Sequence, residues 1–80
     1  MDANRVTELV RSTFSEGEVL VEGAGANYSI TVVSDRFEGL RPVARQQAVY
    51  AALNATIAAG DIHAVNLHTY TPAEWQAAQG

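Results

Sequence analysis

The sequence predicts a two-layer α+β domain, in which a three-stranded mixed sheet carries its helices on one face. Two observations lead to this prediction. Segments with helical periodicity and short runs rich in β-branched residues follow one another in the order α-β-β-α-α-β-α. The connection between the second and third strands contains two helical segments, and such a long crossover allows parallel pairing. Eighty residues without a linker or repeat make a single domain, residues 1–80.

The N-terminal half is predicted to form a helix and a hairpin. Asp2 can cap a helix of about residues 3–15, because apolar positions recur there at spacings of three and four. Strands at 18–22 and 28–34 flank a turn at 23–27 that contains two glycines. Side chains alternate between the two faces of a strand. We therefore expect one alternating set of the second strand to face the core, namely Tyr28, Ile30 and Val32.

The middle of the chain is predicted to hold a tight or single helical turn and then a long helix. The turn covers residues 34–39, where Phe37 is the one large apolar side chain available to fix it. Pro42 suits the first position of a helix over about 42–59, and Gly60 marks its end. The apolar stripe expected on this helix consists of Val49, Tyr50, Leu53 and Ile57.

A third strand over 62–70 and a short terminal helix complete the predicted fold. The segment Thr71-Pro72-Ala73-Glu74 has a capping-box pattern with proline at the first helical position. Three aromatic side chains could serve as anchors for a ligand or could pack in the core, and we expect core packing for Phe37, Tyr50 and Trp75.

Composition excludes several classes of function. The chain contains no cysteine, which excludes a disulfide framework and a self-contained cysteine-ligated metal site. We find no nucleophile elbow, phosphate loop or dinucleotide-binding glycine pattern, so the sequence predicts no enzyme and no catalytic residue. No stretch approaches the ~20 apolar residues of a membrane span. We therefore expect a cytoplasmic protein that does not bind membranes.

Charge is distributed unevenly. The formal net charge is −4, which disfavours non-specific binding to nucleic acid. All five basic residues are arginines, and three of them, Arg36, Arg41 and Arg45, fall within ten residues. This group could contact phosphate or the acidic residues of a protein partner, and it could equally be a solvated face.

The two histidines are the remaining candidates for chemistry. His63 and His68 lie five residues apart on the predicted third strand, so we expect them on opposite faces and not around one metal ion. His63 is the better candidate because it stands at the entrance of the strand, after Gly60-Asp61. A neutral imidazole can ligate iron or zinc. The alternative is an imidazole that only packs or forms hydrogen bonds.

Four motifs in order give the chain a resemblance to the BolA family of stress-associated and iron-sulfur-related proteins. They are Val32-Val33-Ser34-Asp35-Arg36-Phe37-Glu38-Gly39, Val49-Tyr50-Ala51-Ala52-Leu53, Ile62-His63-Ala64 and Thr71-Pro72-Ala73-Glu74-Trp75. The resemblance covers nearly the whole chain and is closest to the short acidic members. It implies a type II KH-like fold and a partnership with monothiol glutaredoxins in iron-sulfur cluster binding, trafficking or the response to iron and redox stress.

The resemblance also implies roles for individual residues. In that partnership a glutaredoxin and its glutathione supply thiolates to a two-iron two-sulfur cluster, and the BolA-like subunit supplies the histidine that matches His63. Many relatives carry a second ligand, His or Cys, at the place of Asn27, and asparagine is at most a weak ligand. A complex without metal is therefore left open. The isolated chain is expected to be a monomer that binds no cofactor of its own.

The alternative function implied by the resemblance is that of a transcription regulator that binds nucleic acid through the KH-like face, with Arg36, Arg41 and Arg45 as contacts. A KH module clamps the backbone with a Gly-x-x-Gly loop. Here the corresponding residues are Gly39-Leu40-Arg41-Pro42, without the second glycine. Gln46-Gln47 replaces a histidine and a basic residue that many relatives carry. We therefore expect weak, salt-dependent binding of DNA.

Overall fold

The computed structural model describes residues 1–79 and shows the predicted order of elements, whereas Gly80 of the predicted domain lies outside the described residues. The two segments between the second and third strands are a 3₁₀ turn, η1, and a long helix. The elements are α1 (Ala3–Arg11), β1 (Glu18–Ala24), β2 (Asn27–Val33), η1 (Asp35–Phe37), α2 (Pro42–Ala58), β3 (Ala64–Tyr70) and α3 (Pro72–Gln79).

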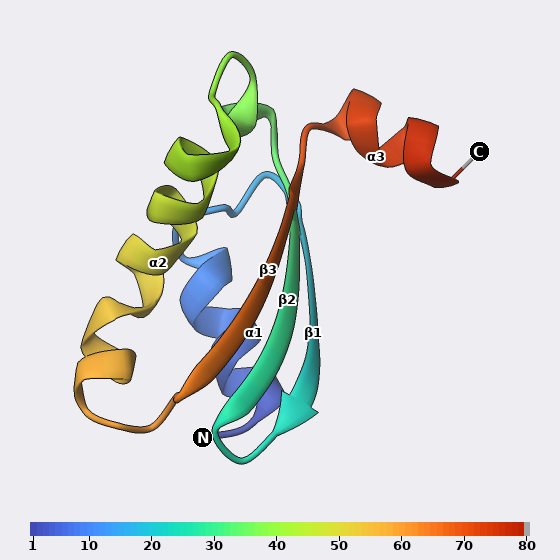
Figure 1. Cartoon of the computed structure of the whole chain (residues 1–80). Helices are drawn as coiled ribbons and strands as arrows, with labels where there is room; N and C mark the ends of the chain where they lie inside the picture. The colour runs from blue at the N-terminus through green and yellow to red at the C-terminus, as the bar shows by residue number, and fades with distance from the viewer. Residues whose placement is uncertain (80) are drawn as a thin grey trace.

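The sheet has the predicted mixed topology, with strand order β1-β2-β3. β1 and β2 form an antiparallel hairpin, and β2 pairs with β3 in parallel. α1 and α2 form one layer on one face of the sheet, while α3 extends outward from the end of β3 (Figure 1). None of the helices in residues 1–79 is long and apolar enough to cross a membrane.

The core lies between this helical layer and the sheet. Its side chains come from both layers and include the predicted alternating set of β2, which confirms the assignment of faces in that strand. Phe37 is fully buried as predicted, and its ring lies 5.3 Å from that of Phe14. The buried cluster consists of Val6, Val10, Phe14, Val19, Tyr28, Ile30, Val32, Phe37, Val49, Leu53 and Ile62.

α1 begins as predicted but ends earlier. The Asp2 carboxylate accepts the Arg5 N–H at 2.8 Å and caps the helix. The helix stops at Arg11 and not at residue 15, because the N–H groups of Thr13 and Phe14 both donate to the Val10 carbonyl and tighten the last turn. This turn lets Phe14 enter the core although it lies outside the helix.

The hairpin turn is shorter than the sequence indicates. β1 and β2 pair as far as Ala24 and Asn27, so the connection is Gly25-Ala26 and not residues 23–27. Gly25 adopts a φ of 64°, in the left-handed region that favours glycine. The turn is therefore a tight, two-residue connection between strands paired to their ends.

α2 has proline at its start and ends one residue before the predicted boundary of 59. Val49 and Leu53 are buried and Ile57 is half-buried, as expected for the stripe. The prediction for Tyr50 was wrong, because this side chain is 36% exposed. Tyr50 follows Val49 directly, so it is rotated by about 100° from the buried line that Val49 and Leu53 define.

β3 and α3 also differ from the prediction in detail. β3 starts at Ala64, two residues later than expected, so His63 precedes the strand. The capping box of α3 is confirmed: the Thr71 N–H donates to Glu74 Oε1 (2.9 Å) and the Glu74 N–H donates to Thr71 Oγ1 (3.2 Å). Trp75 is only half-buried and packs on Tyr70 with ring centroids 5.1 Å apart, so its expected place in the core was wrong. The reason is that α3 lies beyond the helical layer (Figure 1).

Candidate functional site

The structure brings His63 next to the β1–β2 turn. The N–H groups of His63 and Ala64 both donate to the Ala26 carbonyl, at 2.8 Å and 3.1 Å. Asn27, which follows Ala26, is the Cα partner of Ala64 in the parallel register. The side chains of His63 and Asn27 are both exposed. The two positions that the sequence suggested as ligand positions therefore lie on neighbouring segments at one end of the sheet.

Tyr28 contacts this turn from the buried face of the sheet. Its ring is buried, and its hydroxyl lies 2.7 Å from the Gly25 carbonyl and 3.0 Å from the Met1 carbonyl. One hydroxyl has one proton, so it donates to one of these two acceptors at a time. The alternation of side chains in β2 predicts Tyr28 only as a core residue. A tyrosine at a core position beside a glycine-rich turn is the signal that was available, because a buried hydroxyl usually finds a partner.

A hollow of about 350 Å³ opens beside these residues. It lies on the face of the sheet that α1 and α2 leave uncovered, since Ser29 alternates with the buried Tyr28 and Ile30. Sequence reasoning missed it, because its walls come from all three strands. The residues that line it include Glu22, Gly23, Asn27, Ser29, Ala64 and Asn66.

The two histidines occupy different surroundings. His68 lies within β3 opposite Thr31 of β2 and is exposed, whereas His63 precedes the strand. Strand alternation therefore does not determine on which face of the sheet His63 lies. Within residues 1–79, no group of three or more His, Cys, Asp or Glu side chains is placed to hold a metal ion. Each imidazole offers at most one donor to a metal.

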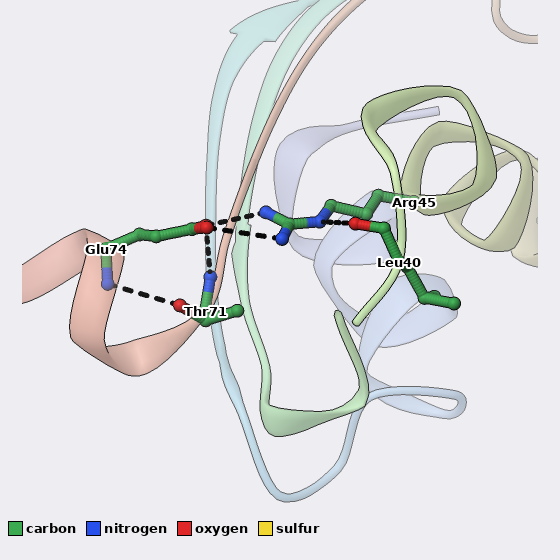
Figure 2. Close-up of polar contacts among 4 residues, drawn as sticks. All are labelled: Leu40, Arg45, Thr71 and Glu74. Atoms are coloured by element: carbon green, nitrogen blue, oxygen red, sulfur yellow. Dashed lines mark hydrogen bonds and ion pairs between the residues drawn. The ribbon is translucent and has the colours of Figure 1, made fainter. Parts of the chain in front are cut away.

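Arg45 is held in a network with α3. Its guanidinium forms two hydrogen bonds to Glu74, Nη1 to Oε1 at 2.6 Å and Nη2 to Oε2 at 3.2 Å, and Nε donates to the Leu40 carbonyl at 2.9 Å (Figure 2). The hydrogen bond from Arg45 and the one from the Thr71 N–H lower the pKa of Glu74. The hydrogen bond to Glu74 raises the pKa of Arg45. The guanidinium carbon also lies 5.9 Å from the Phe37 ring centroid.

The other two arginines are placed differently. Arg36 donates from Nη1 to the Thr13 carbonyl, and its guanidinium lies 5.1 Å from the centroid of the Phe14 ring. Arg41 is exposed at the N-cap position of α2 and makes no side-chain capping hydrogen bond. Two of the three clustered arginines therefore make intramolecular contacts. Arg41 is exposed and makes no side-chain capping bond within residues 1–79, so it can meet a ligand.

Comparisons with known proteins agree with this fold. A family model described as BolA-like protein matches residues 7–74. The chain is 39% identical to the acid stress protein IbaG of Escherichia coli strain K12, over 94% of this chain and 89% of that protein. It is 52% identical to the DNA-binding transcriptional regulator BolA of Vibrio cholerae, over 68% of this chain and 50% of the relative.

The structural comparison gives the same result. The structure of a bolA protein homologue from Coxiella burnetii matches 95% of this chain, and the match covers 97% of that one. The TM-score is 0.84 at 32% sequence identity. The chain belongs to the BolA family.

Proposed function

We propose that this protein is an adaptor that partners a monothiol glutaredoxin in iron-sulfur cluster binding or trafficking, with His63 as its ligand to a shared two-iron two-sulfur cluster. One observation carries the proposal. The exposed imidazole at position 63 stands on a backbone that is hydrogen-bonded to the hairpin turn. Such a side chain is accessible to a second protein while its main chain is fixed. The similarity to a relative named for acid stress supports a role in stress responses.

The donor set fits one half of a coordination site. The sequence has no cysteine, so the soft thiolate ligands that such clusters prefer must come from the glutaredoxin and from glutathione. His63 can add one imidazole nitrogen. The amide of Asn27 is a poor iron ligand, and we assign it to contact with the partner. The proposed location is the cytoplasm, where reducing conditions keep such thiols available.

The test compares His63 with His68. Both side chains are exposed and both belong to the segment around β3, so His68→Ala is a matched control for His63→Ala. A cluster-loaded monothiol glutaredoxin is titrated with each variant and followed by visible circular dichroism. We expect the wild type and His68→Ala to change the spectrum alike and His63→Ala to lose most of the change. Equal behaviour of the two alanine variants would overturn the assignment of His63.

A size-exclusion experiment on the same samples addresses the metal-free alternative. We expect the isolated chain to elute as a monomer and to shift to a larger species with the cluster-loaded partner. If the complex forms while the wild type leaves the spectrum unchanged, the chain docks without sharing the cluster. If no complex forms either, the partnership itself is refuted.

DNA binding is the second candidate, favoured by the relative named as a DNA-binding transcriptional regulator and by the exposed Arg41. It ranks second because Arg36 and Arg45 are engaged in intramolecular contacts and the net charge is −4. Fluorescence anisotropy with duplex DNA at physiological salt is the test. Micromolar or tighter binding that Arg41→Glu abolishes would reverse the ranking.

A further inference from the structure

The hollow beside His63 exists because the sheet lacks bulky side chains at that place. Gly23 cannot be replaced without conflict, since a Cβ there would lie 2.3 Å from the Asn27 carbonyl oxygen, and its φ is 130°. Ala64 contributes only a methyl group. Next to Gly23, the Cα partners Glu22, Ser29 and Asn66 form one row across the three strands. The recess of about 350 Å³ lies over this part of the three strands.

The chemistry of the recess is acidic and rich in acceptors. Glu22 is the one charged side chain among the residues that line it, and in the described part of the chain its carboxylate makes no ion pair. The amide oxygens of Asn27 and Asn66 and the hydroxyl of Ser29 can each accept a hydrogen bond. A carboxylate surrounded by neutral acceptors suits a group with several N–H donors and a positive charge. Lysine ammonium and arginine guanidinium groups have these properties.

The recess begins one residue away from the proposed ligand position. Ala64 lines the recess and directly follows His63, and the N–H groups of both residues bind the same Ala26 carbonyl. A standard protein–protein interface covers roughly 800 Å² on each partner, so a protein that docks at position 63 is large enough to extend over Ala64 and the recess that Ala64 lines. The chain has no lysine, and none of its five arginines is among the residues that line the recess. A cation for Glu22 is thus best supplied by the partner.

We propose that this recess receives a lysine or arginine side chain of the glutaredoxin, which forms a charged hydrogen bond with Glu22 beside the shared ligand position. This inference rests on the proposed partnership and adds the contact that orients the two proteins. Much of the lining is apolar and includes Tyr28, Gly23 and Ala64. The methylene stem of a lysine or arginine can cover such surface while its charged end meets Glu22. Docking of a cation covers the carboxylate and strengthens the pair relative to one in open solvent.

Glu18 provides a matched control for Glu22. The two glutamates lie four residues apart on β1, on the same face of the strand, and both are exposed. Glu18 is opposite Val33 at the other end of the hairpin and does not line the recess. Glu22→Gln and Glu18→Gln each remove one negative charge without changing the shape of the side chain. Long-range electrostatic effects are therefore similar for the two variants. A difference between their dissociation constants measures the contribution of the contact in the recess.

The experiment is a calorimetric titration of a purified cluster-loaded monothiol glutaredoxin, with glutathione present, at two salt concentrations. We expect Glu22→Gln to raise the dissociation constant about tenfold, since a charged hydrogen bond is lost. Glu18→Gln should raise it by no more than about twofold, as for an exposed charge. The salt dependence of binding should also be weaker for Glu22→Gln than for Glu18→Gln.

The outcomes separate this inference from the proposed function. If the wild type binds and responds to His63→Ala while the two glutamine variants bind equally, the role of the recess is refuted and the partnership stands. If the wild type does not bind, the partnership fails and the recess proposal fails with it. Circular dichroism melts of both glutamine variants should match the wild type, because both substitutions are isosteric and exposed.

Discussion

Replacement of Gly17 by alanine tests the closest backbone approach to any of the glycines in residues 1–79. Gly17 lies in the turn before β1, and its N–H donates to the Phe14 carbonyl at 3.1 Å. A Cβ at this position would lie 2.1 Å from the Val33 carbonyl oxygen. An ordinary carbon-oxygen contact is about 3.4 Å, so roughly 1.3 Å of overlap has to be relieved. The neighbouring Ser34 N–H is bonded to the Tyr70 carbonyl, so the end of β2 cannot move away freely.

The expected loss follows from this overlap. Forcing extra atoms into a packed site costs about 1–3 kcal/mol, and we expect the upper end because the atoms in conflict belong to the backbone. A chain of this length has a free energy of unfolding of about 4–12 kcal/mol. A loss of about 3 kcal/mol corresponds to a fall in Tm of about 12–24 °C in a domain of this size. Gly17→Ala should therefore fold at low temperature and melt well below the wild type.

Gly25→Ala is the control for this substitution. Gly25 has a φ of 64°, and a Cβ there would meet no atom within 4 Å. This substitution should lower the free energy of unfolding by only about 1–2 kcal/mol, which is the cost of placing an alanine in the left-handed backbone conformation. Circular dichroism melts and urea titrations of both variants measure the difference. The reasoning is refuted if Gly17→Ala melts within about 5 °C of the wild type, or if Gly25→Ala is the less stable of the two.

Three further predictions follow from the core and from the polar networks. Phe37→Ala should lower the free energy of unfolding by about 3–5 kcal/mol in urea titrations, because a fully buried ring is lost; a loss below about 1 kcal/mol contradicts this. Tyr28→Phe should cost about 1 kcal/mol and speed amide hydrogen exchange at His63, since the turn loses its hydroxyl contact; unchanged exchange would argue against this support. Arg45 lowers the pKa of Glu74, so the pair stabilises the fold above the ordinary glutamate pKa and this contribution disappears as the pH falls through the lowered value. Urea titrations of wild type and Glu74→Gln from neutral to acidic pH should converge in acid, and a constant gap would disprove the linkage.

The parts of the fold that depend on local sequence were predictable. Alternation of Tyr28 with Ser29 assigned the faces of β2, and the pattern from Thr71 to Glu74 gave the start of α3. Each of these two signals is contained in only a few neighbouring residues. Tyr50 was wrongly placed in the core because it lies next to the buried stripe of α2 and fits the helical periodicity approximately. Its side chain lies at the edge of that stripe and is exposed.

The candidate site depends on tertiary contacts that no local pattern contains. β3 begins only at Ala64, because the His63 N–H donates to the Ala26 carbonyl in the hairpin turn. The neighbourhood of Asn27 and Ala64 follows from the parallel register. The arginine cluster illustrates the opposite case, since proximity in sequence suggested one surface. In the fold, Arg45 is instead drawn to a carboxylate on α3.

The hydrogen bond from the His63 N–H to the Ala26 carbonyl uses only main-chain atoms. The position of the backbone at residue 63 therefore does not depend on which side chain that residue carries. Any non-proline residue at position 63 can supply that donor. Position 63 can therefore carry a residue with a thiol, carboxylate or thioether group while the neighbouring hairpin keeps its conformation. Evolution or a protein engineer can thus exchange the coordinating atom here without redesigning the architecture that presents it.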